Sequence, residues 1–586
     1  MIDEVSKSWI RNISDERAAA NGCRFDVLRG AWSVFWIERY CKLYEGDGYA
    51  GEPLILWGCR QCDHSRFHAM QEFDEDAAVE RARLHAHCVA AGHHIDWQYE
   101  FNMRCFSWIR HRAQFGKELR RFRRGSCWLP KKQKKSPTMA ANSLYVFCGD
   151  GEPGQHVYLM AKDGAQSKKI AGEHAHQMLD QSPELRAECK PNMTTMGIFH
   201  PETRSRWEPL SSSNARTQQS KEGLNGSGFV DEAHVVDRAF INRTDRMGIS
   251  RTEPLFLAFS TAGNNPDGWG HEEFEYAEKV IDGRITDEQY LAMIYAAPQD
   301  VTDEQLESDF DKYARMANPS LGHTIDPEEI RADYERSKDT IERLANFKMY
   351  RLNVWQHSSN PWLRPSDWAA CAGEFTEADL LGQTCYGAFD LALRWDTSAL
   401  VLLFPWGEHE QPHFRMLVYF FLPVASARKT RDKAAWFEWE SRGHIKLTDG
   451  DTTDFPLIRR CVNNCKEKFD LRAVAYDDRF AETIAQELKD EDGIDMVDFN
   501  QTPQNFMEPM GLFEADVISG RIEHPNNLCL NWQAGNATKN RKGMLVKPEN
   551  DDVKKIDGIT AAVMARAMAA AAPADVGWSR EDGIFV

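Results

Sequence analysis

The sequence lacks the features that mark membrane-spanning and secreted proteins. No window approaches the roughly eighteen uninterrupted apolar residues that a membrane-spanning helix requires. The opening residues contain no basic region followed by an apolar stretch, so we expect no secretory signal. Repeats and long low-complexity tracts are missing as well. A hydrophobic fraction of 42% and a charged fraction of 27% are typical of an ordinary folded chain without a membrane partner.

A disulfide framework and an excess of positive charge are also missing. The 14 cysteines are mostly scattered singly, which is typical of reduced thiols in a cytoplasm. The net charge of −19 has the wrong sign for a protein that coats nucleic acid with its whole surface. Basic side chains instead gather in residues 110–135, where Glu118 is the only acid. We therefore expect any contact with DNA phosphates to be local.

The hydrophobic pattern predicts an α/β protein with more than one domain. A chain of 586 residues is too long for a single core. Strand-like runs alternate with helical stretches over most of the length, which is the signature of α/β domains. The expected strands are Ser126–Leu129, Val157–Met160, Gly228–Val230, Leu255–Phe259, Tyr386–Phe389, Leu400–Phe404, Met416–Leu422 and Ala473–Tyr476.

The segment after the first of these strands has the residues of a phosphate-binding loop (Walker A). Such a loop needs backbone N–H groups at a helix start, a lysine for the phosphates and a hydroxyl for Mg²⁺. Lys135 and Ser136 fit those roles, and Lys131, Lys132 and Gln133 complete the loop. Lys134 stands where a glycine is usual, and Pro137 follows the serine. Taken alone, this segment also fits a plain basic loop.

Two later strands end in residues that ATP hydrolysis requires. Asp231 follows the strand Gly228–Val230 as in a Walker B motif and can hold Mg²⁺, while Glu232 can orient or deprotonate the attacking water. Ser260 and Thr261 follow the strand Leu255–Phe259 and can sense the γ-phosphate. The three segments together, in this order, predict an ATP site.

In the second half, three acids stand at positions that converge in a ribonuclease H-like fold. Asp390 ends one strand, Asp477 ends a later strand, and Asp557 opens an alanine-rich helix. Two metal ions about 3.5–4 Å apart need several such carboxylates, and hard oxygen ligands favour Mg²⁺ or Mn²⁺. Asp396 and Asp478 are auxiliary candidates. The pattern predicts a two-metal nuclease.

A group of cysteines and histidines near the start predicts a zinc-finger-like insertion. Cys59 and Cys62 are separated by two residues, and His87 and His93 follow a helical stretch. Two thiolates and two imidazoles can hold a tetrahedral Zn²⁺. The rival ligands are His85, Cys88 and His94.

Several segments resemble the terminase large subunits of the HK97-like group of phages. In the first half these are residues 129–170, 223–240 and 253–263. In the second half they are Cys385–Asp390, Val474–Asp477, Asn531–Asn536 and Lys555–Gly558. By this resemblance Trp97 and Gln98 contact adenine, and Asp390, Asp477 and Asp557 are the nuclease metal ligands. An arginine finger is implied too, among Arg243, Arg246 and Arg251.

The resemblance implies a DNA-packaging enzyme of the host cell cytoplasm. Such an enzyme uses ATP to move double-stranded viral DNA into a procapsid, and its metal-dependent endonuclease cuts the concatemer. It works as a homo-oligomeric ring, a pentamer, on the portal protein, together with a terminase small subunit. The implied cofactors are ATP and Mg²⁺ or Mn²⁺. The structural Zn²⁺ is expected from the cysteines and histidines of residues 58–94, which look like an insertion relative to the family pattern.

These assignments give a domain plan, and two alternatives stay open. We expect an N-terminal helical region (1–57), a zinc-knuckle-like insertion (58–94), a P-loop (ASCE-type) ATPase motor domain (95–365), a linker (366–382), a ribonuclease H-like nuclease domain (383–575) and a tail (576–586). The first alternative is another helicase-nuclease or a transposition-type DNA enzyme. The second is a DNA-binding scaffold with an inactive motor, which Lys134 and Pro137 favour.

Overall fold

The chain forms two compact units in a computed structural model. One unit comprises Met1–Lys338 and Asn346–Gln356, and the other Asp339–Ala345 and His357–Val586. The structure describes residues 2–571 except 44–50, 113–115, 163–171, 212–223, 245–246, 266–267, 357–361, 394–395, 408–410, 431–433, 541–542 and 548–553. The expected tail lies outside the described residues. Within them, no helix is both long and apolar enough to cross a membrane.

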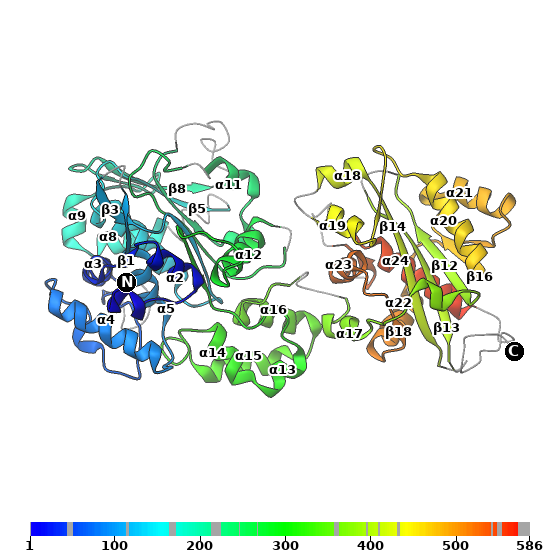
Figure 1. The fold of residues 1–586 in the computed structure, drawn as a ribbon, viewed down its shortest axis with the longest axis horizontal. Coiled ribbons are helices and arrows are strands. Elements are labelled where there is room, and N and C mark those ends of the chain that lie inside the picture. Colours follow the sequence, from blue (N-terminus) through cyan, green and yellow to red (C-terminus); the bar gives the residue numbers. More distant parts are fainter. Residues whose placement is uncertain are drawn as a thin grey trace. The chain divides into compact units, whose positions relative to one another are not determined.

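The first unit is built on an eight-stranded sheet whose central strands are parallel (Figure 1). The strand order is β11-β4-β10-β9-β5-β8-β7-β6, in which the pairs β8–β7 and β7–β6 are antiparallel and the other pairs are parallel. β10 lies between β4 and β9, so the carboxyl ends of these three strands meet at one edge. The bounds are β4 Arg124–Trp128, β5 His156–Ala161, β6 Lys190–Asn192, β7 Gly197–His200, β8 Ser205–Ser211, β9 Ser227–Asp231, β10 Phe256–Ser260 and β11 Tyr290–Ile294.

Helices cover both faces of this sheet because its strands are apolar on both sides. Phe229 belongs to the core beneath α6 (Lys135–Leu144), whereas its neighbour Val230 faces the core beneath α12 (Trp269–Ile281). Such continuous apolar runs are typical of parallel strands buried on both faces. Four further helices follow β11: α13 Asp303–Ser308, α14 Phe310–Ala317, α15 Pro327–Ser337 and α16 Ile341–Leu352.

Three N-terminal helices pack together ahead of this sheet. They are α3 (Val27–Tyr40), α4 (Glu75–Ala90) and α5 (Trp97–Ser107). α4 begins at the N-cap Asp74, whose side chain accepts a hydrogen bond from the N–H of Ala77. A small antiparallel sheet joins this part, formed by β1 Arg24–Phe25, β2 Trp108–Arg112 and β3 Lys117–Arg120.

The second unit is a seven-stranded mixed sheet with helices on both faces (Figure 1). Its order is β15-β14-β13-β12-β16-β17, and β18 pairs with β14. Ala388 faces the core beneath α22, α23 and α24, while Phe389 faces the core beneath α20 and α21. The bounds are β12 Thr384–Asp390, β13 Ser398–Trp406, β14 His413–Pro423, β15 Lys446–Thr448, β16 Asp470–Tyr476, β17 Met496–Asp498, β18 Ile522–Glu523, α20 Phe455–Lys468, α21 Asp478–Asp490, α22 Pro503–Ile518, α23 Leu528–Asn536 and α24 Asp557–Ala570.

The expected strands are all present, and the α/β class is confirmed. The second sheet is mixed because β13 runs antiparallel to both β12 and β14, whereas β12, β16 and β17 are parallel. The carboxyl ends of β12 and β16 therefore lie side by side, which brings the predicted acids to one edge.

Candidate active sites and a cysteine–histidine cluster

The phosphate-binding loop connects the end of β4 to the start of α6. Lys134 caps the helix with φ 57° and ψ 32°, a left-handed conformation. This is the position where a glycine is usual, and the lysine takes the backbone conformation that a glycine adopts without a Cβ clash. Pro137 lies in the first turn of α6, where a missing N–H leaves no intrahelical bond unmade. Both unusual residues are therefore compatible with a phosphate-binding backbone.

The ammonium group of Lys135 lies at the carboxyl edge of the sheet. It donates hydrogen bonds to the carbonyl oxygens of Leu129 (2.8 Å) and Pro130 (2.7 Å) and to Oγ1 of Thr261 (2.6 Å). Burial lowers the pKa of Lys135 to about 8, although the carboxylates of Glu232 and Asp231 act in the opposite direction. The loop lysine and the residue after β10 thus already meet.

Ser136 and Asp231 form the next contact along this edge. The serine hydroxyl donates to Oδ2 of Asp231 at 3.0 Å. Burial and the neighbouring charge of Glu232 raise the pKa of Asp231 to about 6. A buried carboxylate beside a second carboxylate favours a cation, and a hydroxyl with a carboxylate is a hard-oxygen pair that suits Mg²⁺.

His234 links Glu232, the acid after β9, to Ser260 at the end of β10, and the sequence analysis assigned no role to it. Its Nδ1 lies 3.2 Å from Oε2 of Glu232 and 3.0 Å from Oγ of Ser260. Its backbone N–H also donates to Oγ of Ser260 at 3.0 Å. Burial lowers the pKa of His234 to about 4, so the ring is neutral at pH 7. Its only sequence signal is its place two residues after Glu232.

Trp97 and Gln98 lie beneath the loop, and the contact with adenine that the resemblance implies stays a prediction. Both side chains are buried, because α5 packs into the core behind α6. Nε1 of Trp97 donates to the carbonyl oxygen of Gln133 at 3.0 Å, and Nε2 of Gln98 donates to Oγ1 of Thr138 at 2.8 Å. In the structure the pair therefore supports the loop and the start of α6 from the protein interior.

The remaining loop residues differ in exposure. Gln133 is buried. Its side-chain amide donates a hydrogen bond to Oδ1 of Asn318 and accepts one from the N–H of Ser320, which connects the loop to the segment after α14. Nζ of Lys131 lies 3.4 Å from the ring centroid of Tyr350. Lys132 is exposed.

The predicted arginine finger is not located by the structure. Arg251 forms an ion pair with Glu152 at 3.8 Å and bonds the carbonyl oxygen of Pro153. Arg246 and the side chain of Arg243 lie outside the described residues.

The nuclease acids gather at the edge where β12 and β16 end. Phe389 and Tyr476 are paired across these parallel strands, so Asp390 and Asp477 follow at adjacent positions. Burial and the charges of Asp477 and Asp396 raise the pKa of Asp390 to about 7. Among the described residues, no three of these acids bring their oxygens within 4.8 Å of one another. Neighbouring carboxylates repel one another, which favours such a spacing.

Asp557 joins this group from the first turn of α24. Burial and the charges of Asp396 and Asp390 raise its pKa well above the usual range. The hydroxyl of Thr397 donates to its carboxylate. Nζ of Lys555 lies 2.8 Å from Asp396, so this auxiliary acid is paired with a lysine. The side chain of Asp478 lies outside the described residues.

Polar side chains around these acids were missed in the sequence as site residues. Gln501 and Thr560 lie beside Asp390, and the interaction of their side chains with its carboxylate opposes the rise in its pKa. The buried amide of Gln533 accepts from the N–H of Gly558 at 2.7 Å and donates to Oγ1 of Thr397 at 3.2 Å. Gln533 therefore fixes the start of α24, next to Asp557. Only Gln533 and Gly558 stood in segments that the sequence had singled out.

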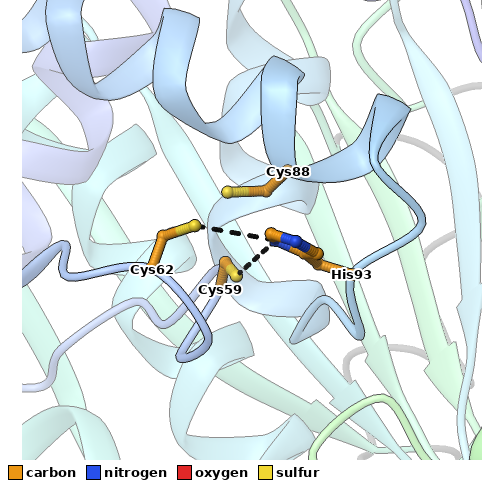
Figure 2. A group of neighbouring side chains, drawn as sticks. All are labelled: Cys59, Cys62, Cys88 and His93. Carbon is orange, nitrogen blue, oxygen red and sulfur yellow. Dashed lines mark hydrogen bonds between the residues drawn. The ribbon is translucent and has the colours of Figure 1, made fainter.

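Four side chains of the N-terminal insertion form a tight cluster (Figure 2). The ligand atoms of Cys59, Cys62, Cys88 and His93 all lie within 4.8 Å of one another. His87, which the sequence interpretation included, is exposed and outside the cluster. On α4 the inward positions are those of Arg81, His85 and Cys88, and residue 87 points about 100° away from its neighbour 88.

Two of the alternative zinc ligands, His85 and His94, make their contacts outside the cluster. His85 is buried and its Nε2 lies 2.7 Å from Oε2 of Glu100. The ring of His94 packs against His323, with ring centroids 5.9 Å apart. Cys88, the remaining rival, is the residue that the structure places in the cluster.

Topology and site residues together define a class of protein. A loop lysine and serine after β4 meet an acid at the end of β9, at the shared edge of three parallel strands with β10 between the two, as in a P-loop nucleotide hydrolase. The second sheet brings acids from two strands and a helix to one edge, as in a ribonuclease H-like nuclease. Residues 284–573 match the family model for the terminase large subunit, endonuclease domain. The chain is therefore a relative of phage terminase large subunits.

Two relatives match more than half of the chain. The protein YmfN of Escherichia coli (strain K12) is 28% identical over 358 residues, which cover 57% of this chain and 75% of the relative. The terminase large subunit of Enterobacteria phage HK97 is 25% identical over 340 residues. That match covers 57% of this chain and 64% of the relative, slightly less than two thirds of its length.

Solved structures of terminases are similar only at a low level. The crystal structure of the HK97 bacteriophage large terminase has a TM-score of 0.42 at 18% identity, and the match covers 92% of this chain and 99% of that one. The large terminase nuclease from thermophilic phage G20c with bound magnesium has a TM-score of 0.23 at 11% identity over 36% of this chain and 98% of that one. The family assignment rests on the sequence matches, because these structural likenesses are weak.

Proposed function

We propose that this chain is a DNA-packaging motor that uses ATP to move double-stranded DNA and cuts it with a metal-dependent nuclease. The observation that carries the proposal is the meeting of Lys135, Ser136, Asp231 and Thr261 at one sheet edge. The same chain contains a terminase endonuclease domain in residues 284–573. Motor and nuclease chemistry thus stand in one polypeptide.

In the ATP site, each residue has a role that its position supports. Lys135 exchanges its contacts with Leu129, Pro130 and Thr261 for phosphate oxygens, because an anion is a stronger acceptor than a carbonyl. Ser136 and Asp231 hold the Mg²⁺ that neutralises phosphate charge during transfer. Together these groups place the γ-phosphate at the edge formed by β4, β10 and β9.

Glu232 orients the attacking water, and His234 connects it to the end of β10. The neutral imidazole contacts both Glu232 and Ser260, so a change at either residue alters the contacts of the other. Ser260 and Thr261 follow β10, next to the lysine that binds phosphate. We therefore assign to this segment the coupling of phosphate loss to movement of the rest of the unit.

In the nuclease, Asp390, Asp477 and Asp557 would hold Mg²⁺ or Mn²⁺, which would supply activation of water and stabilisation of the leaving oxygen. Burial and the neighbouring carboxylates raise the pKa values of Asp390 and Asp557, and a divalent cation between these groups would relieve their repulsion. Lys555 balances Asp396 at the rim of this group, and Gln533 holds α24 in place. A phosphodiester anion then meets a site that divalent cations have neutralised.

The packaging context belongs to the same proposal. The proposed partners are double-stranded DNA, a terminase small subunit, the portal protein of a procapsid and further copies of this chain in a pentameric ring. The proposed location is the host cell cytoplasm. Support comes from the family of residues 284–573 and from the HK97 relative, a terminase large subunit.

Lys135→Ala tests the motor directly. We expect the variant to lose DNA-stimulated ATP hydrolysis by at least about 100-fold, because a preorganised charge at the phosphate is removed. Phosphate release from the purified full chain is the measurement. Lys7→Ala is the control, since Lys7 is an exposed lysine near the N-terminus and outside the phosphate-binding loop. Unchanged turnover in Lys135→Ala would remove this lysine from the site and favour the inactive-motor alternative.

A further inference from the structure

We propose that Cys59, Cys62, Cys88 and His93 bind one structural Zn²⁺, and that this ion fixes the start of α5 beneath the phosphate-binding loop. The metal site stands on its own geometry. Its link to the loop rests on the proposed ATP site. Figure 2 shows the four side chains converging from the segment before α4, from α4 itself and from the turn after it.

The distances in the cluster fit tetrahedral zinc. Sγ of Cys59 and Sγ of Cys62 each lie 3.6 Å from Nδ1 of His93. With a Zn–S distance of about 2.3 Å and a Zn–N distance of about 2.1 Å at a tetrahedral angle, sulfur and nitrogen lie about 3.6 Å apart. The observed separations are thus those of two ligands that share one ion.

The donor set selects zinc among common metals. Three thiols and one imidazole are soft or borderline ligands, and no carboxylate belongs to the cluster. Four protein ligands close the coordination sphere, which is typical of structural rather than catalytic zinc. Cys59 and Cys88 are buried, and Cys62 and His93 are half-buried, so the ion would be shielded from bulk water.

A neighbouring histidine supports the thiolates from outside the cluster. Nε2 of His64 lies 3.6 Å from Sγ of Cys88, and His64 is itself buried. A ring N–H that donates to a metal-bound thiolate stabilises its negative charge. His64 does not belong to the group of four, so we assign it to the surroundings of the metal.

The segment that the metal would organise has little regular structure of its own. Residues 54–64 contain neither helix nor strand beyond one isolated bridge between Cys59 and Ile95. A segment of this kind is held mainly by side-chain contacts, and metal binding then supplies part of its folding free energy. Removal of the ion should therefore loosen residues 54–64 first.

A short path leads from the cluster to the phosphate-binding loop. The N–H of Asp96 donates to the carbonyl oxygen of Gly58 at 2.6 Å, and the N–H of Tyr99 donates to that of Trp57 at 3.1 Å. Asp96 is the N-cap of α5, and its carboxylate accepts from Oγ of Ser320 at 3.1 Å. The residues next to Cys59 are thus bonded directly to the first turn of α5.

That first turn carries the two side chains that bind the loop. Trp97 bonds the carbonyl oxygen of Gln133, and Gln98 bonds Thr138 in α6. Only three residues separate His93 from Trp97. The metal thus positions the loop indirectly, and none of its ligands is a catalytic residue.

Metal analysis of the full chain tests the site. We expect one zinc per chain in the wild type and in His87→Ala, whose side chain is exposed, and less than one in Cys88→Ser. Cys62→His keeps a ligand atom and should retain metal, which separates lost ligation from misfolding. Replacement by Co²⁺ should give sulfur-to-cobalt absorption in the wild type. A wild type without zinc, or loss of zinc from His87→Ala as large as from Cys88→Ser, would overturn the site.

Nucleotide affinity tests the link to the loop. We expect Cys88→Ser to weaken the binding of a non-hydrolysable ATP analogue by about ten- to a hundred-fold, because misplacement of about 1 Å is costly at such a site. His87→Ala should bind as the wild type does. If the wild type contains zinc and the zinc-free Cys88→Ser variant binds the nucleotide equally well, the link between the metal and the loop is overturned. If no form binds nucleotide, the proposed ATP site fails while the zinc count still decides the metal site.

Discussion

At residue 134 the backbone takes a left-handed conformation that most side chains avoid, with φ 57° and ψ 32°. The missing glycine in this loop had been the main reason to consider an inactive motor. The structure shows that the lysine adopts the conformation of that glycine, while Lys135 and Ser136 keep their contacts. The departure from the usual loop therefore affects local strain more than the placement of the phosphate-binding groups.

A pair of substitutions at this position measures the strain. Lys134→Gly and Lys134→Ala both remove the ammonium group, but only glycine removes the Cβ that makes φ > 0 unfavourable. We expect the glycine variant to be the more stable of the two, with a free energy of unfolding higher by about 1 kcal/mol and a correspondingly higher melting temperature. Thermal unfolding of both full-length variants under the same conditions is the measurement. A more stable alanine variant would show that residue 134 is not left-handed.

Single residues also mark the limit of sequence reasoning. Spacing favoured His87 as a zinc ligand, whereas the helix turns Cys88 inward, and only the register of α4 against its neighbours decides between them. Trp97 and Gln98 were identified as a functional pair, but their burial depends on how α5 packs behind α6. Local spacing does not contain this packing information. Candidate ligands could be named from the sequence, but the choice among them needed tertiary structure.

At the scale of elements, the positions of the strands could be predicted from the sequence. Apolar runs such as Val157–Met160 and Leu400–Phe404 are strands because buried strands give a strong local signal. The strand order was not predictable in the same way, because β10 pairs with β4 across more than a hundred residues. Gln501 and Thr560 were missed for this reason, since their approach to Asp390 depends on long-range packing.

The meeting of β12, β16 and α24 predicts a pH-dependent instability without metal. The folded pKa of Asp390 is about 7, above its ordinary 3.8. Between these values the folded state binds more protons than the unfolded state, so this group contributes less stability as pH rises. At pH 8 Asp390 is ionised and its destabilising effect on the folded state is complete. Asp390→Asn removes this effect because asparagine carries no charge. We expect the variant to gain roughly 1–3 kcal/mol at pH 8 and much less at pH 4, without added divalent cation.

Thermal unfolding of the full chain at the two pH values checks this expectation. Asp498→Asn is the matched control, because Asp498 is an exposed acid at the end of the neighbouring strand β17. Equal stability changes for the two variants at both pH values would contradict the account of Asp390. A gain at pH 4 that disappears at pH 8 would reverse the sign and exclude repulsion as the cause.

At the scale of the whole molecule, the chain combines two proposed catalytic centres, an ATP site and a nuclease site. Lys135 and Asp231 belong to the first unit, and Asp390 and Asp557 belong to the second. The family match reaches across residues 284–573 and includes the second centre entirely. The order of the two modules could be predicted from the sequence because each motif is local to a strand end. The contacts within each centre could not, since they join residues that are far apart in the chain.

The most direct test of the two-centre account is cleavage of supercoiled plasmid by the full chain with Mg²⁺ or Mn²⁺. We expect metal-dependent cleavage by the wild type and by Lys135→Ala, and none by Asp390→Ala or Asp557→Ala. The two aspartate variants should still hydrolyse ATP, which shows that the chain is folded. Cleavage by Asp390→Ala and Asp557→Ala at the wild-type rate, or no cleavage by an ATP-hydrolysing wild type with either metal, would contradict the assignment of the nuclease.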